Sequence, residues 1–451
     1  MHRLPILLVI LSTSVCSAET FSLLLTRNLH GEAAKLIGAG MAAASVKQAG
    51  GAAILLDSGA ALSASEDMFD HRRQGSLSVA LMNQSGYAGW FLSHRDLAWS
   101  DRLTSFLRRT DFPVLSANSH RPETGRHLFQ VQPYSVLRVA GHRVGVIGLA
   151  GPASDVLTSD PVSAADYYAS LIAPRCDLVV VASDGSTESE SQIANLASVD
   201  LVIGVGSSES ASRVGSGWVL VTEDEPGLWG IDVSVYGDSV TSIVSSRMAI
   251  PAVDPAVIRE ALVGWTANLE GEPVSLGTVI GRSEGGFQRA LTSPLGYFVA
   301  DVVQAAAETD GALIRTSHVP DDFVTGDISV YDLLRAYSLP YTIGIARIKG
   351  HDLTRLLDLS GGELTFYPSG ISVVYGGDEN GGSLVASTIN GNPIDPRVDY
   401  TVAVEYGATA DPALAGPNVR DTGLTVRDVL AAHIRTSASV KGVVDGRVQR
   451  R

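Results

Sequence analysis

Six polar side chains lie at or near the ends of apolar runs in the sequence, and their types are those that bind divalent metal ions. They are Asn28, His30, Asp57, His94, Asp96 and Asp184. Such groups can hold two cations roughly 3.5–4 Å apart and activate a bridging water for attack on a phosphate ester. Each also has a simpler explanation, because an Asp or Asn after a strand usually caps a helix or forms a turn. A metallohydrolase site and ordinary turn chemistry are therefore both open.

The elements that would position these residues alternate between short apolar runs and helical patterns. The apolar runs are residues 21–25, 53–56, 144–149, 178–181 and 201–203, and the helical patterns include 33–48 and 101–109. Short buried strands separated by helices are typical of a layered α/β domain. Ligands of such domains bind beyond the carboxyl ends of the strands. We therefore expect the loops at residues 26–30, 57–59, 183–185 and 204–208 to meet at one crevice.

The pattern changes near residue 250, which indicates a second domain. Pro251 and Pro255 flank the start of an amphipathic stretch, 257–269, that predicts a linking helix within residues 250–275. Helical patterns follow at 295–307 and 330–337, and alternating strands around 371–375 and 400–404. We expect a first α/β domain over residues 19–249 and a smaller α/β domain over residues 276–451, because the chain is too long for one ordinary core.

Composition limits the kinds of partner that the chain can bind. The formal net charge is −15 over 451 residues, which argues against a nucleic-acid partner because phosphate backbones are bound by clustered Lys and Arg. The sequence has one basic cluster, the terminal Arg447, Arg450 and Arg451, which we expect to form a frayed end. A hydrophobic content of 45% with 46 Gly and 19 Pro is typical of a globular, turn-rich protein.

Residues 1–18 have the organisation of an export signal. Arg3 precedes an apolar run at residues 4–11, and Ser17 and Ala18 are small residues suited to cleavage. The run is shorter than the roughly 20 residues of a membrane span. We expect a mature chain that starts at Glu19, lies in the periplasm or cell envelope, and has no transmembrane span.

The two cysteines leave one alternative open. Cys16 would be the lipid-modified residue if the protein were a lipoprotein, although the preceding residues 13–15 match a lipobox poorly. Once Cys16 is removed with the signal, Cys176 has no intrachain disulfide partner. Its apolar neighbours at residues 178–180 predict a buried, unreactive thiol.

Taken in chain order, the polar strand ends resemble the motifs of one family, the periplasmic 5′-nucleotidases and UDP-sugar hydrolases. Thr26-Arg27-Asn28-Leu29-His30-Gly31 resembles the Thr-Asn-Asp-Leu-His-Gly that opens their calcineurin-like metallophosphoesterase domain. Leu56-Asp57-Ser58-Gly59-Ala60 resembles their Asp-Ala-Gly-Asp segment, and residues 86–99 parallel the stretch with Gly-Asn-His-Glu-Phe-Asp. Residues 113–118 and 144–149 match family segments, and 177–184 and 200–208 fall where the Ser-His and Gly-His-x-His motifs belong. The resemblance implies a four-layer first domain.

The second half resembles the family's C-terminal nucleotide-recognition domain. The matching segments, in the family's order, are residues 295–301, 326–328, 339–341, 349–353 and 369–371. The resemblance thus covers nearly the whole mature chain. It implies a nucleotide or another small molecule as the partner, with Phe366 and Tyr367 as candidate base-stacking rings; core packing is the other interpretation of both rings.

The departures from the family's motifs fall on its metal ligands. The family's first motif supplies an Asp and a His, which are Asn28 and His30 here; its bridging Asp falls at Ala60, and its Asn-His pair falls at His94 and Arg95. The next His is replaced by Asp184, and the paired histidines fall at Gly206 and Ser208. Asn28, His30, His94 and Asp184 remain as vestigial candidate metal ligands. Loss of the bridging carboxylate should abolish tight binding of two metals, because that group offsets the repulsion between the cations.

The C-terminal domain departs in parallel, since the family's phosphate-binding loop Asn-Gly-Gly-Gly-x-Arg falls at residues 315–320 without its Asn or its Arg. We therefore expect an exported family member that is non-catalytic, needs no cofactor, has no catalytic residue at Arg95, and acts as a binding or scaffold protein of the envelope. The alternative is a phosphoester or nucleotide hydrolase with one Mn, Zn or Mg ion held by Asn28, His30, His94 and Asp184.

Overall fold

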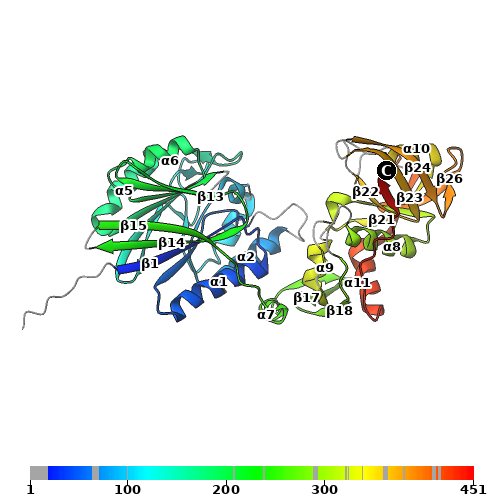
Figure 1. Cartoon of the computed structure of the whole chain (residues 1–451), viewed down its shortest axis with the longest axis horizontal. Helices are drawn as coiled ribbons and strands as arrows, with labels where there is room; N and C mark the ends of the chain where they lie inside the picture. Colours follow the sequence, from blue (N-terminus) through cyan, green and yellow to red (C-terminus); the bar gives the residue numbers. More distant parts are fainter. Residues whose placement is uncertain are drawn as a thin grey trace, which may run out of the picture. The chain divides into compact units, whose positions relative to one another are not determined.

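The structure, a computed structural model, describes residues 19–62, 71–98, 100–206, 209–236, 239–287, 293–319, 322–323, 325–337, 339–358, 364–378, 381–408, 413–414 and 418–450. Contacts divide the chain into two compact units, one of residues 1–63 and 75–253 and the other of residues 64–74 and 254–451 (Figure 1). The expected signal peptide, with Cys16, lies outside the described residues. No described helix is both long and apolar enough to cross a membrane.

The first unit is built on two mixed sheets. One has the order β15-β14-β1-β2-β3-β4-β6 and the other β12-β13-β11-β10-β8-β7. The strands of the first sheet are β1 (Glu19–Arg27), β2 (Ala53–Asp57), β3 (Tyr87–Phe91), β4 (Val114–Leu115), β6 (Val131–Gln132), β14 (Gly227–Tyr236) and β15 (Ser239–Met248). Those of the second are β7 (Tyr134–Val139), β8 (His142–Leu149), β10 (Leu178–Ser183), β11 (Leu201–Gly206), β12 (Ser210–Val214) and β13 (Gly217–Glu223). In each sheet, parallel strands form the centre.

Helices cover the outer faces of these sheets. They are α1 (Ala33–Gln48), α2 (His71–Gln84), α3 (His94–Leu97), α4 (Ser100–Leu107), α5 (Pro161–Ile172) and α6 (Thr187–Ala194). Strand β10 shows why four layers form: Leu178 and Val180 enter the core shared with the other sheet, while Val179 and Val181 pack in the cluster that contains α5 and α6. A strand buried on both faces must be apolar at every position. The predicted four-layer α/β domain is confirmed.

The second unit is also α/β. Its main sheet has the order β22-β19-β26-β21-β27, and a smaller one has the order β25-β24-β23-β28. These strands are β19 (Gly311–Arg315), β21 (Thr342–Lys349), β22 (Phe366–Ser369), β23 (Ile371–Asp378), β24 (Gly381–Ile389), β25 (Asn392–Pro393), β26 (Asp399–Glu405), β27 (Val419–Thr425) and β28 (Val448–Arg450). Two short pairs, β16 (Thr266–Leu269) with β17 (Glu272–Ser275) and β18 (Val279–Ser283) with β20 (Gly326–Ser329), precede or border them.

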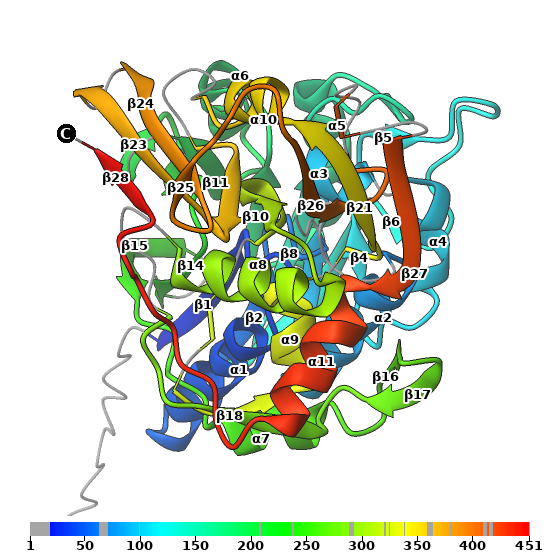
Figure 2. The ribbon, with the colours of Figure 1, turned by 90° about the vertical axis from the view of Figure 1, so that its right-hand side faces the viewer.

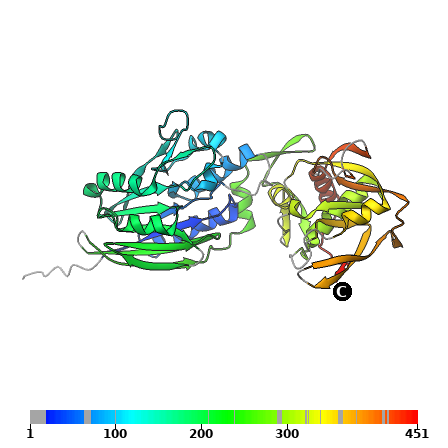
Figure 3. The same cartoon turned by 90° about the horizontal axis from the view of Figure 1, so that it is seen from above.

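The helices of this unit are α7 (Pro255–Ala261), α8 (Pro294–Ala307), α9 (Val330–Ala336), α10 (Gly350–Leu356) and α11 (Val426–Thr436). Helix α8 packs against β19, β22 and α11, and the pair α8 and α11 is clear in Figure 2. Strands β23 and β24 form a hairpin near the chain's C-terminus (Figure 3). The predicted helices at 295–307 and 330–337 and the strands around 371–375 and 400–404 are confirmed.

The predicted linking helix is mostly wrong. Helix α7 has seven residues, capped by the Asp254 side chain, which accepts the Ala256 N–H; the rest of the predicted stretch becomes the hairpin of β16 and β17. Glu270 and Gly271 form the turn with φ angles of 54° and 84°, a combination that two-residue hairpin loops require. Because Glu270 and Gly271 form a tight turn, this stretch becomes a hairpin although its apolar residues have helical spacing.

The predicted frayed C-terminus is also wrong at Arg447. Its guanidinium donates to both carboxylate oxygens of Asp301, to Asp445 and to the Pro368 carbonyl, and it lies 4.9 Å from the centre of the Tyr297 ring. Arg450 belongs to β28, and Arg451 lies outside the described residues. The partners of Arg447 come from distant segments, so no local pattern indicated them.

Candidate functional site

Three of the four loops predicted to meet, at residues 26–30, 57–59 and 183–185, contact one another in the first unit. The Asn28 N–H donates to the Gly59 carbonyl (3.1 Å), and the His30 N–H donates to the Ala60 carbonyl (3.1 Å). Asn28, His30 and Ala60 all have left-handed backbones, with φ of 52°, 51° and 59°. Non-glycine residues rarely adopt this conformation, and here it turns two loops sharply beyond β1 and β2. Ser208, the last residue of the predicted crevice, lies outside the described residues.

A buried ion pair occupies the centre of this crevice. The Arg27 guanidinium donates to Asp184 Oδ1 (3.0 Å) and to the Ser58 carbonyl (3.1 Å), and the two side chains are only 3% and 8% exposed. The other Asp184 oxygen accepts from the His94 backbone N–H (2.7 Å) and contacts His94 Nδ1 (2.6 Å). Both oxygens of Asp184 are therefore already engaged.

A second ion pair adjoins the first. Arg95 donates to both carboxylate oxygens of Asp224, at 3.0 and 2.8 Å, and this pairing lowers the pKa of Asp224 to about 2. Arg95 also donates to Asn28 Oδ1 (2.8 Å), while Asn28 Nδ2 donates to Asp224 (2.8 Å). Arg27 Nε lies 3.7 Å from the same carboxylate. We call Arg27, Arg95, Asp184 and Asp224, with Asn28 and His94, the arginine cluster.

Asp57 lies beside this cluster without forming an ion pair in it. It is fully buried, accepts the Gly59 N–H (2.8 Å) and bonds to the Thr26 hydroxyl (2.6 Å). Burial raises its pKa to about 8, against the smaller lowering effect of Thr26. Asp57 is thus mainly protonated at neutral pH.

Asp96 is the N3 residue of a capping box at the start of α3. It accepts N–H groups from Ser93 (3.0 Å), Ala60 (2.8 Å) and Leu62 (3.2 Å). Burial raises its pKa. Asp96 therefore holds the loop of Ala60 in place, which is the turn and cap chemistry that the sequence left open.

The donors at this place do not fit a two-metal centre. Ala60, the position of the family's bridging carboxylate, is 1% exposed and has only a methyl group, and Gly206 has no side chain. Asn28 Oδ1 and both oxygens of Asp184 are bonded to Arg95, Arg27 or His94. Within the described ranges, no group of three or more His, Cys, Asp and Glu side chains is arranged to hold a metal ion.

Electrostatics lead to the same result. A divalent ion about 2.2 Å from Asn28 Oδ1 would lie within about 5 Å of the Arg95 nitrogen. The repulsion of two such charges is roughly 7 kcal/mol at an effective dielectric constant of about 20. The two carboxylates of the cluster balance the two guanidinium groups, so the cluster as a whole offers a metal ion no net negative charge. The positive charge at these strand ends comes from two guanidinium groups, those of Arg27 and Arg95.

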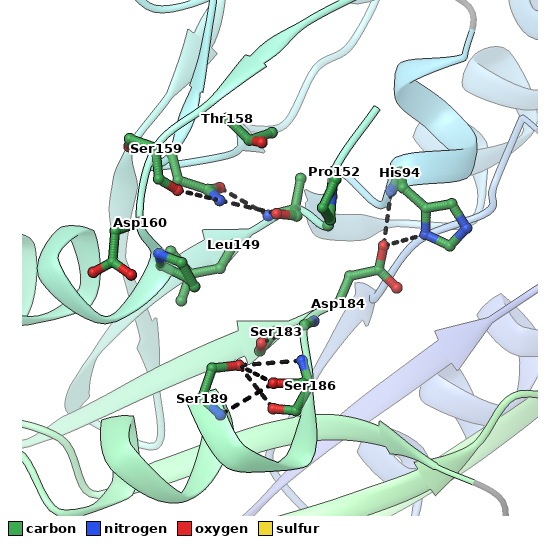
Figure 4. Close-up of a pocket in the computed structure, with 15 residues that line it drawn as sticks. His94, Leu149, Pro152, Thr158, Ser159, Asp160, Ser183, Asp184, Ser186 and Ser189 are labelled. Carbon is green, nitrogen blue, oxygen red and sulfur yellow. Dashed lines mark hydrogen bonds and ion pairs between the residues drawn. The ribbon is translucent and has the colours of Figure 1, made fainter. Parts of the chain in front are cut away.

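Beside the arginine cluster is a pocket of about 680 Å³. His94 and Asp184 lie on one side, and the loops after β8 and β10, the start of α5 and the start of α6 form the remainder (Figure 4). The volume is within the range of small-molecule sites. The pocket is lined mainly by hydroxyl, carboxylate and small apolar groups.

The nucleotide-recognition candidates of the second unit lie in packed surroundings. Phe366 and Tyr367 are 7% and 5% exposed; Phe366 belongs to the core and faces the Arg315 guanidinium at 5.6 Å, and the Tyr367 ring contacts Tyr297 edge to face at 5.8 Å. A base could stack on either ring only if that ring left this packing.

The loop at residues 315–319, where the family's phosphate loop falls, is tied to Glu405 instead. The Glu405 carboxylate accepts from the Arg315 backbone N–H (3.0 Å), contacts His318 Nδ1 (2.9 Å) and accepts the Tyr337 hydroxyl (2.5 Å). His318 also stacks on Tyr341 at 5.3 Å. Pro320 lies outside the described residues.

Sequence reasoning missed two members of the arginine cluster, Arg27 and Asp224. Arg27 directly precedes Asn28 at the end of a buried strand, where a charged residue is unusual, and that position was a usable signal. Asp224 follows β13 within the acidic run Glu223-Asp224-Glu225. Its partner Asn28 is 196 positions away, so no spacing indicated the contact.

Comparison with known proteins gives similarities in both halves of the chain. Residues 279–410 match the family model of the 5′-nucleotidase C-terminal domain. The 5′-nucleotidase precursor from Thermus thermophilus has a similar fold over 96% of this chain and 99% of its own, with a TM-score of 0.56 at 18% identity. The sulfate thiohydrolase SoxB, also from Thermus thermophilus, is similar over 93% of this chain and 82% of its own, with a TM-score of 0.51 at 17% identity.

A curated relative, the endonuclease YhcR from Bacillus subtilis (strain 168), is 24% identical over 353 residues. The matched region is 68% of this chain and 28% of that relative, so the chain spans a minor part of the relative's length.

Proposed function

We propose that this chain is an exported, non-catalytic member of the 5′-nucleotidase family that binds a small molecule; the match to the family's C-terminal domain and the similar fold support the family part of this proposal. The observation that carries this proposal is the arginine cluster. Arg27 and Arg95 neutralise Asp184 and Asp224 at the strand ends, where the family resemblance puts two metal ions. A site without a bridging carboxylate and with two fixed cations lacks the means to generate a metal-bound nucleophile.

Although several motif residues are missing, the polar groups that remain in the crevice are paired, and this supports a binding role for an intact fold. The buried Asn28 and Asp184 side chains have hydrogen-bonded partners, and so has the more exposed Asp224. An unpaired buried charge would cost several kcal/mol, so the cluster keeps the crevice stable without metal. The scaffold therefore remains available for binding.

Export rests on the signal-like residues 1–18, and we propose the periplasm or cell envelope as the location. Mass spectrometry of the mature N-terminus tests this: a chain that starts at Glu19 is the expected result, whereas a lipid-modified Cys16 would mean membrane anchoring. Nucleic acid is not proposed as a partner, because the net charge is −15 and phosphate binding needs clustered basic residues.

The central test measures hydrolysis and metal binding together. Purified mature protein is incubated with AMP, UDP-glucose and a chromogenic phosphate ester, with and without Mn²⁺, and Mn²⁺ binding is followed by calorimetry. We expect no metal-dependent turnover and no measurable Mn²⁺ binding.

Two variants make the outcome specific. Turnover that requires Mn²⁺, disappears in His30→Ala and persists in the control His351→Ala would overturn the proposal. It would favour a hydrolase with one metal held by Asn28, His30, His94 and Asp184. His351 is a suitable control because its side chain is 75% exposed and lies in the second unit.

A further inference from the structure

The pocket beside the arginine cluster has a chemistry of its own. Its walls come from the first unit alone, from the strand ends of β8 and β10 and from the first residues of α5 and α6. The described lining contains no Lys and no Arg, and His94 supplies its one aromatic ring. The charged groups are the carboxylates of Asp160 and Asp184, as Figure 4 shows.

The charges of the lining disfavour an anionic ligand. Arg27 is bonded to the lining residue Asp184, and that pairing neutralises its charge. Asp160 is an exposed carboxylate at the N-terminus of α5 that forms no ion pair with the residues that the structure describes, and hydrogen bonds from Ser163 lower its pKa. A phosphate that entered would meet this carboxylate without a matching cation.

Helix N-termini often bind anions through their unbonded N–H groups, but both helix starts in this pocket use side chains as caps. The Asp160 carboxylate accepts the Ser163 N–H at 2.8 Å. The Ser186 hydroxyl accepts the Ser189 N–H at 3.3 Å in a capping box. These amide groups are therefore already bonded within their helices.

The groups that remain for a ligand suit hydroxyls. Asp160 accepts the backbone N–H and the side chain of Ser163, and because an ionised carboxylate has about four acceptor positions it can still accept from a ligand. His94 is tied to Asp184 through Nδ1, which leaves Nε2, and its side chain is 46% exposed. The Ser183 hydroxyl accepts the Gly185 N–H and retains a proton to donate. Carboxylate, imidazole and hydroxyl groups together both accept from and donate to alcohol groups.

From this lining we propose that the pocket binds an uncharged, polyhydroxylated molecule, a sugar, through Asp160, His94 and Ser183. The inference rests on the proposed binding function and names the class of its ligand. A volume of about 680 Å³ exceeds that of one monosaccharide, so a sugar with a substituent also fits. Because no large aromatic ring lines the pocket, a single sugar should bind in the millimolar range.

The test uses ligand-observed NMR on the full mature chain with D-glucose, D-ribose, AMP and inorganic phosphate as separate probes. We expect at least one of the two sugars to give saturation transfer and phosphate to give none. Asp160→Asn removes the charge and keeps a side chain that can cap α5. It should weaken sugar binding roughly tenfold, because hydrogen bonds to a charged acceptor are stronger than those to a neutral one.

Asp166→Asn is the matched control, since Asp166 lies on the same helix, is exposed and is not part of the lining. It should bind like the wild type, and thermal unfolding shows whether either variant has lost its fold. Binding of phosphate or AMP in preference to sugars would overturn the inference, as would equal sugar binding by Asp160→Asn or no binding by any probe. A protein that binds no sugar and hydrolyses no phosphate ester would contradict this inference alone and leave the non-catalytic assignment standing.

Discussion

Replacement of Asp57 by Asn tests the protonation state of the buried carboxyl group beside the arginine cluster. The Asp57 carboxyl group is fully buried, and its pKa is raised to about 8 by desolvation. The Asn side chain imitates the protonated acid, because its amide can donate to the Thr26 hydroxyl while its oxygen accepts the Gly59 N–H. We expect the free energy of unfolding of Asp57→Asn to depend less on pH than that of the wild type.

The sign and size follow from proton linkage. An acid with a folded pKa above its unfolded value binds its proton more tightly in the folded protein. Its contribution to stability therefore falls as pH rises from about 4 to about 8 and is constant above that range. With a folded pKa of about 8, Asp57 should lower the free energy of unfolding by roughly 3 kcal/mol between pH 6 and pH 9.

The assay is urea denaturation of wild type, Asp57→Asn and the exposed control Asp166→Asn at pH 6 and pH 9. The difference in stability between Asp57→Asn and wild type should grow by about 2 kcal/mol or more at pH 9, whereas the control should follow the wild type. If the difference in free energy of unfolding between Asp57→Asn and wild type were the same at pH 6 and pH 9, the conclusion that Asp57 is protonated in the folded protein would be refuted. If Mn²⁺ stabilised the wild type but not Asp57→Asn, the result would indicate that Asp57 binds a metal ion.

Three further outcomes test other parts of the structure. The double variant Ala60→Asp/Arg95→His, which restores two metal-site groups, should gain a Mn²⁺-dependent rise in melting temperature that the wild type lacks; an equal rise in both would contradict the loss of the site. Ala60→Gly should change the free energy of unfolding by less than about 0.5 kcal/mol, because glycine adopts the left-handed backbone without strain and this gain offsets the lost methyl group and the added entropy of the unfolded chain. Ala39→Gly within α1 should lower the free energy of unfolding by about 1.5 kcal/mol or more. Arg447→Ala should destabilise the second unit by roughly 2 kcal/mol in chemical denaturation, and a loss no larger than that of the exposed control Lys441→Ala would show that its ion pairs are not stabilising.

Local patterns were enough to predict most elements of the fold. The apolar runs of β1, β2, β8, β10 and β11 and the helical periods of α1, α8 and α9 reflect burial of one or both faces, which the order of residues records directly. The linking helix shows where this fails. An amphipathic period predicted one long helix, but the turn at Glu270-Gly271 made a hairpin.

The sequence by itself also determined what the crevice lacks. Alanine at position 60 and glycine at position 206 have no side-chain atom that can bind a metal ion, and this follows from the residue type alone. Order along the chain likewise indicated that the loops would meet, because the carboxyl ends of parallel strands share one edge of a sheet.

Only the tertiary structure decided which side chains pair at the strand ends where the family resemblance places metal ions. The partnership of Arg27 with Asp184 joins residues 157 positions apart, and that of Asn28 with Asp224 joins residues 196 apart. No periodicity encodes such pairs, since they arise from packing two sheets against each other. The protonated state of Asp57 has the same origin, because it depends on how completely the surrounding chain removes water from one carboxyl group.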